Sequence, residues 1–410
     1  MMSALRRRLP ARVPPAAAPL YWARGLRAFA DGYISLLLPV YLKALGFDAF
    51  QIGLIAATTL VGSAAATIAV GFTAHRFGRR WLLVIATLLM IGTGVGFVAA
   101  TQFWPLMVIA FVGTLNPSPS DVSLFLPLEQ ALLAEAAPAK ARTNAFVVYS
   151  LIGSLVGALG SLAAGVPELV HGWLGVDAID ALRWMFGLYA VLGLATYHLY
   201  RRLPASLDAK PEKPTPPLGP SRKIVFGLAA LFSLDAFGGG LVVQSLLALW
   251  LFERFGLSLA VAGTIFFWSG LASAASFIAA GHLAKRIGLV NTMVFTHFPS
   301  NLCLIAMAFA PKLWLVVALW LARSALSQMD VPARTSYVMA MVTPPERAAA
   351  ASVTAVPRSL AAAVAPALAG WLLALSPFGW PVLIAGGLKG IYDLLLLGCF
   401  GRRKPPEEAD

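Results

Sequence analysis

Long runs of apolar residues, separated by short basic or proline-rich stretches, dominate the 410-residue chain. Many of these runs have the length of about 20 residues that a helix needs to cross a hydrocarbon core of about 30 Å. Two of them, residues 52–73 and 81–101, flank a short basic segment that contains Gly71 and Gly78. This alternation predicts membrane-spanning helices that are joined by tight polar turns.

The apolar runs divide into two sets of six. They cover residues 20–45, 52–73, 81–101, 104–128, 143–166 and 181–200, and then 224–251, 258–281, 289–310, 313–331, 348–375 and 380–401. The polar, proline-rich residues 201–223 between the two sets predict an extended linker. We therefore predict an all-α integral membrane protein with twelve transmembrane helices. Its two six-helix halves would cover residues 20–200 and 224–401, with tails at residues 1–19 and 402–410.

The two halves repeat each other at two places. The basic segment from Gly71 to Arg80 returns between Gly281 and Gly288, with the same seven-residue spacing of glycines. After the fourth run, a series of proline, alanine, glutamate, proline and arginine ends at Arg142. A similar series follows the tenth run and ends at Arg347. These echoes predict a duplicated fold.

These motifs resemble those of the major facilitator superfamily of secondary transporters, whose loop between helices 2 and 3 carries Gly-x-x-x-Asp-Arg-x-Gly-Arg-Arg/Lys. The matching positions are Gly71, Arg76, Gly78, Arg79 and Arg80. His75 stands where the family usually has Asp, and Lys285 stands there in the second copy. The resemblance covers residues 20–402.

The resemblance implies two parallel halves in the major facilitator fold, with a binding site near the midplane at their interface. It also implies that helices 1, 4, 7 and 10 line a central cavity. Gating is expected at the basic turns and helix ends, which contain Gly71, Arg76, Gly78, Arg79, Arg80, Arg142, Gly281, Arg286, Gly288 and Arg347.

Composition supports the membrane assignment. With 59% hydrophobic and 12% charged residues and a mean hydropathy of +0.79, a soluble chain would lack the polar surface to cover itself. A net charge of +13 could indicate nucleic acid, but basic residues at membrane helix ends follow from topology, so no nucleic-acid partner is expected. Both cysteines lie in apolar runs and the five histidines show no metal-ligand spacing, so we expect no disulfide, metal or cofactor.

Basic residues gather on one side of the predicted map. That side holds the arginine-rich N-terminal tail, the 76–80 turn, the linker and the C-terminal tail, whereas the other side holds only Lys43, Arg183, Arg254 and Lys312. The positive-inside rule then places both termini and the linker in the cytoplasm. The N-terminal residues lack the apolar stretch of a signal peptide. The expected location is a bacterial inner membrane, which the protein would cross many times.

Ionisable residues inside the apolar runs are the candidates for function, because a charge in a membrane is costly. Asp31 and Asp235 lie near the middle of the first and seventh runs, and each is closely followed by glycines that allow a bend. Arg27, one turn before Asp31, could neutralise it; otherwise Asp31 would bind a proton or the substrate. Asp235 has no basic residue one turn away, so its partner is another helix, a proton or a ligand. Desolvation favours the protonated form of such a carboxyl, which makes Asp235 the expected coupling residue.

Cations also lie within the runs. Arg358 is close to the expected midplane of the eleventh run and would either pair with Asp235 or Asp330 or fix an anionic group of the substrate. On the tenth run, Arg323, Asp330 and Arg334 form a polar stripe along one helix face. Such a stripe is expected to face the cavity or other helices.

A break and an ion pair are predicted elsewhere. The segment from Asn116 to Asp121 contains two prolines, so it should interrupt the fourth helix and line protein or water. Lys389 and Asp393 stand one turn apart in the last run and are expected to neutralise each other without a role in transport.

The end of the fourth run carries Glu129 and Glu135. They could meet the arginines of the 76–80 turn as a latch of the closed state, or they could belong to a solvated helix end. Some polar and aromatic side chains in the runs could contact substrate, although packing is their more common role: Tyr33, Tyr149, Gln244, Phe266, Phe267 and Trp268.

No segment matches the phosphate-binding loop Gly-x4-Gly-Lys-Ser/Thr, so energy should come from a gradient. We therefore predict a monomeric, non-enzymatic secondary transporter that exports a small organic solute in exchange for protons, similar to the drug and metabolite exporters of the family. One alternative is an organic-anion carrier that uses Arg358, Arg323 and Arg24. Another is a non-transporting receptor or a membrane-embedded enzyme, although no catalytic set is visible in the sequence.

Overall fold

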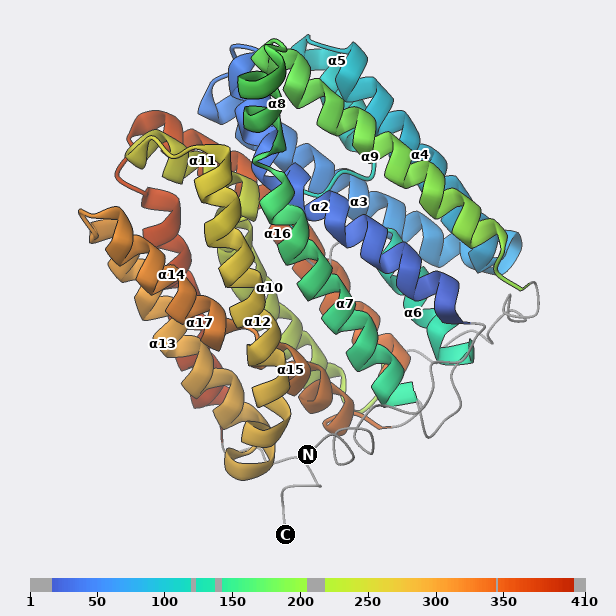
Figure 1. Cartoon of the computed structure of the whole chain (residues 1–410). Coiled ribbons are helices and arrows are strands. Elements are labelled where there is room, and N and C mark those ends of the chain that lie inside the picture. The colour runs from blue at the N-terminus through green and yellow to red at the C-terminus, as the bar shows by residue number, and fades with distance from the viewer. Residues whose placement is uncertain (1–16, 119–122, 137–141, 205–217, 344–345, 402–410) are drawn as a thin grey trace, which may run out of the picture.

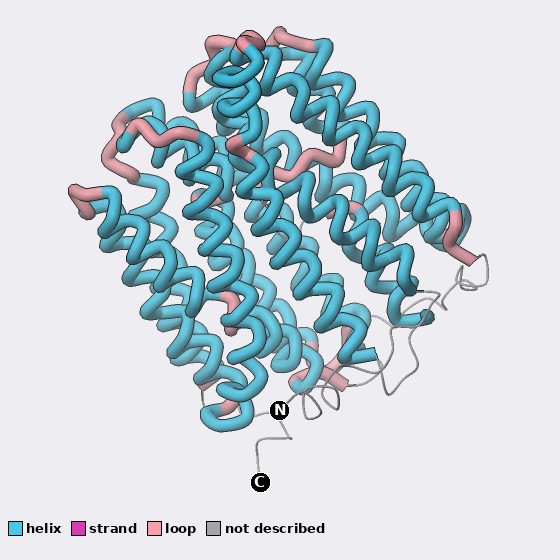
Figure 2. The backbone as a smooth tube through the Cα atoms, in the orientation of Figure 1, coloured by secondary structure: helices cyan, strands magenta, loops and turns pink. Residues whose placement is uncertain are grey.

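The computed structural model describes residues 17–118, 123–136, 142–204, 218–343 and 346–401, whose regular structure is entirely helical (Figure 2). The helices of the first half are α2 (Ala18–Ala44), α3 (Ala49–Phe77), α4 (Arg79–Ala99), α5 (Phe103–Val112), α6 (Phe125–Ala136), α7 (Arg142–Ala163), α8 (Val166–Leu174) and α9 (Ala178–Arg201). Those of the second half are α10 (Arg222–Leu241), α11 (Gln244–Phe255), α12 (Leu259–Ile287), α13 (Leu289–Phe309), α14 (Leu313–Ser327), α15 (Asp330–Ala340), α16 (Arg347–Leu375) and α17 (Trp380–Phe400). The predicted linker and both tails lie largely outside these residues.

Within the described residues, nine segments are long and apolar enough to cross a membrane, and α5 is a shorter apolar helix. The outer surface is rich in large apolar side chains: Trp22, Trp104 and Trp173 are each at least 70% exposed. A surface of this kind would aggregate in water and is stable against lipid. The predicted all-α integral membrane fold is therefore confirmed. The arrangement is consistent with twelve spans, of which α2 supplies one and the pairs α5/α6, α10/α11 and α14/α15 one each.

Three of the predicted spans are interrupted. The predicted break near Asn116 is present, because α5 ends at Val112 and α6 begins at Phe125, although Asp121 lies outside the described residues. A second break at residues 242–243 follows the glycines at which we expected a bend. The third, at residues 328–329, was not predicted. The prediction of one helix over 313–331 was wrong because the helix breaker nearest to the break, Pro332, lies just beyond that run, in the first turn of α15.

Single glycines form the two predicted turns. Gly78, with φ 72°, is the only residue between α3 and α4, and Gly288, with φ 85°, stands in the same way between α12 and α13. Glycine adopts positive φ without the steric cost that a side chain brings. Gly71 and Gly281 lie inside the last turns of α3 and α12, so the turn is shorter than the ten-residue segment that we predicted.

The two halves pack together along two helix pairs, α3 with α16 and α7 with α12 (Figure 1). Glycines allow this contact to be backbone against backbone. A Cβ added to Gly53 would lie 2.7 Å from the Cα of Gly370, and one added to Gly263 would lie 2.4 Å from the carbonyl oxygen of Ser161. Larger residues at these crossings would therefore push the halves apart.

Polar contacts join the halves at the end of the molecule that carries α8 and α11, opposite to where α2 begins and α17 ends (Figure 1). We call it the far end. Lys43 Nζ lies 2.9 Å from Glu253 Oε1 there. The carboxylate of Glu168, on α8, accepts hydrogen bonds from the amides of Leu259 (2.6 Å) and Ala260 (3.1 Å) at the start of α12. Side chains and backbone thus join the two halves at the far end.

Candidate functional site

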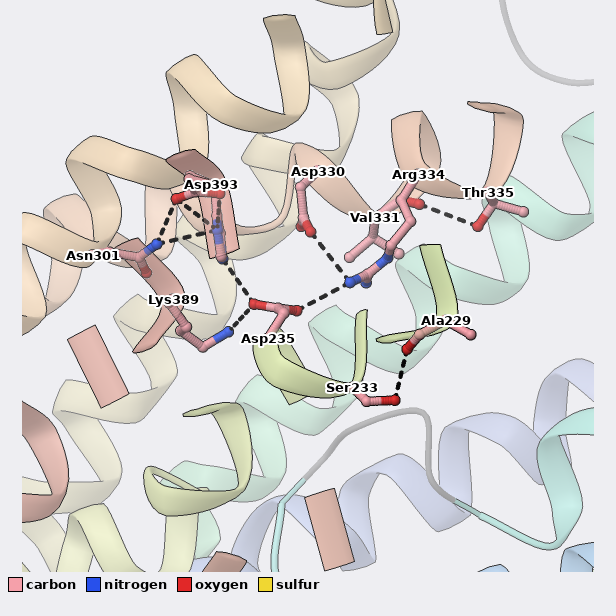
Figure 3. Close-up of polar contacts among 11 residues, drawn as sticks. Ala229, Ser233, Asp235, Asn301, Asp330, Val331, Arg334, Thr335, Lys389 and Asp393 are labelled. Atoms are coloured by element: carbon pink, nitrogen blue, oxygen red, sulfur yellow. Dashed lines mark hydrogen bonds and ion pairs between the residues drawn. The ribbon is translucent and has the colours of Figure 1, made fainter. Parts of the chain in front are cut away.

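A buried network of charges surrounds Asp235 in the second half (Figure 3). Its Oδ1 lies 2.6 Å from Nζ of Lys389, and its Oδ2 accepts a hydrogen bond of 3.1 Å from Nη1 of Arg334. Nε2 of His297 lies 3.7 Å from Oδ1. The predicted partner from another helix is therefore present, and α13, α15 and α17 each supply one.

The network continues through two more carboxylates. Asp393 Oδ1 lies 3.0 Å from Nδ1 of His297, and Asn301 Nδ2 donates to its Oδ2 at 2.8 Å. On the other side, Asp330 Oδ2 lies 3.5 Å from Nη1 of Arg334. We call the following residues the C-half cluster: Asp235, His297, Asn301, Asp330, Arg334, Lys389 and Asp393.

Helical spacing explains how this cluster is assembled. Three helices each present two members one turn apart: His297 and Asn301 on α13, Asp330 and Arg334 on α15, and Lys389 and Asp393 on α17. Asp235 on α10 lies among them (Figure 3). Gly238 makes room for the lysine, because a Cβ there would lie 3.0 Å from Lys389 Cγ.

The predicted neutralisation of Lys389 by Asp393 was wrong. Lys389 pairs with Asp235, and Asp393 contacts His297 and Asn301. Sequence spacing identified two polar residues on one face of α17, but it could not show that carboxylates and cations of other helices lie closer. His297 and Asn301 were missed; the available signal was two polar residues one turn apart in an otherwise apolar run.

A second buried cluster lies in the first half. Arg27 forms an ion pair with Glu129, whose side chain is fully buried. Tyr149 and Tyr200 both donate hydrogen bonds to the same carboxylate, the latter at 2.6 Å. The guanidinium of Arg27 also lies 4.1 Å from the ring centroid of Phe125, a cation–π contact. We call these five residues, from α2, α6, α7 and α9, the N-half cluster.

This cluster corrects two predictions. Arg27 pairs with Glu129 and not with Asp31, which is half-buried one turn further along α2. Glu129 was expected to meet the arginines of the 76–80 turn or to be solvated; it is fully buried, and among the described residues its ion pair is with Arg27. Glu135 does make the contact considered for it, an ion pair with Arg79.

The remaining candidate cations lie on α14 and α16. Arg323 is half-buried on α14, with its guanidinium 4.7 Å from the ring centroid of Trp320. Arg358 is half-buried on α16. Arg334 makes the ion pairs with Asp235 and Asp330 that were one of the two roles considered for Arg358. The other role, which is to fix an anionic group of the substrate, stays a prediction.

The other predicted site residues are at helix ends or in the first break. Asn116 is buried, and its Oδ1 accepts a hydrogen bond of 3.2 Å from the amide of Ser118. Arg286 and Arg347 are exposed, and Nε of Arg347 donates to the carbonyl of Met339. The side chains of Arg76 and Arg142 lie outside the described part of the structure.

The aromatic and amide candidates serve as packing or bridging groups. Tyr33 donates to the carbonyl of Met185 at 3.1 Å, and Phe266 packs edge-on against Trp320. Gln244 Nε2 donates to Ser35 Oγ at 2.9 Å and so joins α11 to α2. Gln244 is thus a contact between the halves.

A cavity of about 200 Å³ opens between the halves, bounded by α3, α6 and α16. Its wall contains apolar side chains and four that can form hydrogen bonds, and none of its lining residues is charged. The lining residues are Ala64, Thr67, Ile68, Ser123, Leu126, Pro127, Gln130, Ala355, Val356 and Ser359. They occupy the part of α3 and α16 away from the far end. A larger cavity of about 410 Å³ lies between the halves at the far end, lined by residues of α2, α8 and α9 on one side and of α11 and the start of α12 on the other.

The family follows from a comparison with known families. The model of the family described as the Major Facilitator Superfamily matches residues 20–311 and 228–410. The chain belongs to this superfamily. Its members have a two-half transporter fold, so the clusters and the cavity lie in the framework of a membrane transporter.

Known proteins and solved structures resemble the chain along almost its whole length. The uncharacterized membrane protein YJR124C of Saccharomyces cerevisiae is 25% identical, and the alignment covers 93% of both chains. The nucleoside transporter NupG superimposes with a TM-score of 0.71 at 14% identity and covers 95% of this chain and 100% of its own. The human organic anion transporter MFSD10 superimposes with a TM-score of 0.64 at 19% identity, and the alignment covers 93% of this chain and 100% of MFSD10. At these identities the structures establish the fold.

Proposed function

We propose that this protein is a monomeric secondary transporter that exports a small organic solute in exchange for protons, with both termini in the cytoplasm. The supporting observation is the charge balance of the C-half cluster. It contains the carboxylates Asp235, Asp330 and Asp393, and among the described residues the permanently charged side chains that form ion pairs with them are Lys389 and Arg334. One carboxylate charge is therefore left without a permanently charged partner in direct contact.

An uncompensated charge in a membrane interior is costly, and binding one proton removes it. Arg323 is within electrostatic reach of Asp235 and Asp330, but it makes no ion pair with either among the described residues. The cluster is thus a reservoir for one proton. This assigns proton coupling to the whole cluster around Asp235.

The position of the cluster links proton binding to movement. Two of its helices, α10 and α15, belong to the seventh and tenth spans, which line the central cavity in this superfamily. Asp235 and Arg334 join these helices directly. A change in the protonation of the cluster therefore changes the interaction between the two cavity-lining spans of one half.

The chemistry of the 200 Å³ cavity suggests the class of substrate. Thr67, Gln130 and Ser359 can donate and accept hydrogen bonds, while its other walls are mainly apolar. Such a wall suits a small organic solute with a few polar groups and no net charge, because a charged group would find no counter-charge among the lining residues.

The first experiment identifies the solute and then tests coupling. Metabolite levels are compared inside and outside cells that lack or overproduce the protein, and the solutes that change are tested in proteoliposomes with an imposed pH gradient. We expect accumulation on the acidic side of the gradient, and a protonophore should abolish it. Accumulation that a protonophore leaves unchanged would show that protons are not the coupling ion.

Transport of organic anions is the second candidate, and the arginines favour it. Arg24 lies 5.1 Å from the ring centroid of Tyr149 and Arg323 lies 4.7 Å from that of Trp320. Neither makes an ion pair within the described residues, so both could receive an anionic group. Flux that is independent of pH but is competed by carboxylates would favour this candidate over proton exchange.

A further inference from the structure

We infer that His297 holds the coupling proton, as an imidazolium between Asp393 and Asp235. This inference rests on the proposed function and assigns its proton to one side chain that sequence analysis overlooked. His297 is 3% exposed and lies on α13, while the two carboxylates come from α17 and α10. The proton site would therefore connect three helices.

Each ring nitrogen of His297 faces a carboxylate. Nδ1 lies 3.0 Å from Oδ1 and 3.2 Å from Oδ2 of Asp393, and Nε2 lies 3.7 Å from Oδ1 of Asp235. A neutral imidazole carries a proton on only one nitrogen. Either neutral tautomer thus turns a lone pair toward a carboxylate, whereas the imidazolium turns an N–H toward both. The geometry fits the charged form.

Asn301 fixes the position of Asp393. Its Nδ2 donates to Asp393 Oδ2 at 2.8 Å and lies 3.1 Å from Nδ1 of His297, so its second N–H must turn away from Nδ1 when that nitrogen carries a proton. The amide therefore holds Asp393 against the imidazole edge. A fixed carboxylate is a stronger acceptor than a mobile one, because no ordering cost remains when the proton arrives.

The helices packed against α13 bring several charged and titratable groups toward it. From α17, Lys389 lies on Asp235, and Tyr392 packs edge-on against His297 with ring centroids 5.9 Å apart. α15 contributes Asp330 and Arg334, and α14 contributes Arg323. The sequence of α12 has no titratable residue between Leu259 and Gly281. Only Asp235 and Asp393 make ion pairs with His297 among the described residues.

The two contacts of the imidazole differ in a way that suits release of the proton. The contact with Asp393 is short and stays within the pair α13 and α17. The contact with Asp235 is longer and reaches α10, a cavity-lining span. Movement of α10 away from α13 would remove one acceptor of the imidazolium, while Lys389 could still neutralise Asp235. The proton would then leave His297.

Nuclear magnetic resonance of the detergent-solubilised full chain, with nitrogen-15 in the histidine rings, tests the protonation directly and needs no substrate. At pH 7.5 exposed histidines are neutral, since their pKa is about 6.5. We expect one histidine with two protonated ring nitrogens, and its signals should be missing in His297→Gln. If that variant does not fold, variants of the other four histidines identify the signal by elimination. A neutral His297 at pH 7.5 would overturn the inference.

Asp393→Asn removes the negative charge of the closer acceptor and should make His297 neutral at pH 7.5. Glu129→Gln, which removes the buried carboxylate of the N-half cluster, is the matched control and should leave His297 protonated. An imidazolium that persists unchanged in Asp393→Asn would count against the proposed site.

Transport then separates this inference from the function on which it rests. Wild-type protein that shows no accumulation driven by a pH gradient would refute proton exchange itself. If the wild type accumulates solute and His297→Gln does so with the same pH profile, the function stands and His297 is not the proton site. We expect His297→Gln to lose accumulation above equilibrium while solute-for-solute exchange continues.

Discussion

Each half buries an ion pair between its first span and the second part of its fourth span, but the polarity is opposite. In the first half, α2 supplies the cation Arg27 and α6 supplies the anion Glu129. In the second half, α10 supplies the anion Asp235 and α15 supplies the cation Arg334. The alignment that places Pro127 opposite Pro332 also places Glu129 opposite Arg334.

The two clusters also differ in how completely they are neutralised. The N-half cluster has one anion and one cation, and the hydroxyls of Tyr149 and Tyr200 satisfy the carboxylate further. The C-half cluster adds two carboxylates, one lysine and one histidine. Corresponding positions of the duplicated fold thus hold a fully neutralised ion pair in the first half and a cluster that can bind a proton in the second half.

The largest effect is expected from Asp235→Asn. It leaves Lys389 and Arg334 buried without their shared carboxylate, and breaking a buried pair in this way costs about 3–5 kcal/mol. We expect a strongly lowered thermal unfolding temperature in detergent and loss of gradient-driven accumulation in proteoliposomes. Asp180→Asn, which breaks the exposed pair with Arg183, is the control and should have little effect. Unchanged accumulation and an unchanged pH profile would exclude a coupling role for Asp235.

Glu129→Gln should destabilise the protein by a smaller amount, about 2–3 kcal/mol, because the amide oxygen can still accept from one of the two tyrosines while the amide NH2 donates to the hydroxyl of the other. Since the N-half cluster has no excess charge, the pH profile of transport should be unchanged. The measurements are thermal unfolding and initial rates between pH 5.5 and 8.5. A shifted pH profile would show that both halves take part in proton binding.

The third prediction concerns Gly78. Its φ is positive, and a β-branched residue adopts positive φ only with strain. Gly78→Val should cost about 1–3 kcal/mol of backbone strain and slow transport several-fold, while the protein remains inserted. Gly92→Val is matched to it, because Gly92 lies in α4 with open space around the position of a Cβ. Equal turnover of the two variants would remove the turn at Gly78 from the gating mechanism.

The smallest effect is expected at Glu346, outside the membrane-spanning segments. Hydrogen bonds from Thr343 and Ser221, and from the amide of Gly219, lower the pKa of Glu346 from its ordinary value of 4.5 to about 2. Its stabilising contribution is therefore complete above pH 4.5 and is lost as the pH falls toward 2. The unfolding temperature of Glu346→Gln should be slightly below wild type at pH 7 and should approach it at pH 3. A difference that does not change with pH would contradict this account.

The sequence predicted the features that depend on local pattern. The apolar runs identified most helices, and Gly78 and Gly288 marked the turns, because a basic segment with glycines can only be a tight turn between two such runs. The break near Asn116 was visible through its prolines. These features are encoded by residues that are close together in the chain.

Contacts between helices could not be predicted in the same way. Lys389 and Asp393 are one turn apart and appeared to be partners, yet each has a closer partner on another helix. Arg27 and Asp31 gave the same misleading pattern. His297 was missed because a single histidine in an apolar run gives no sign of the carboxylates that tertiary packing brings to it.

The contact between Glu168 and the start of α12 has a consequence for the solvent. Its carboxylate satisfies the amides of Leu259 and Ala260, which a helix leaves without partners at its start. If the halves separate at the far end, these amides and the carboxylate must be hydrated instead. Opening there would consume water molecules, so a neutral osmolyte excluded from the crevice should slow it. Water activity would then regulate this protein without occupying any binding site.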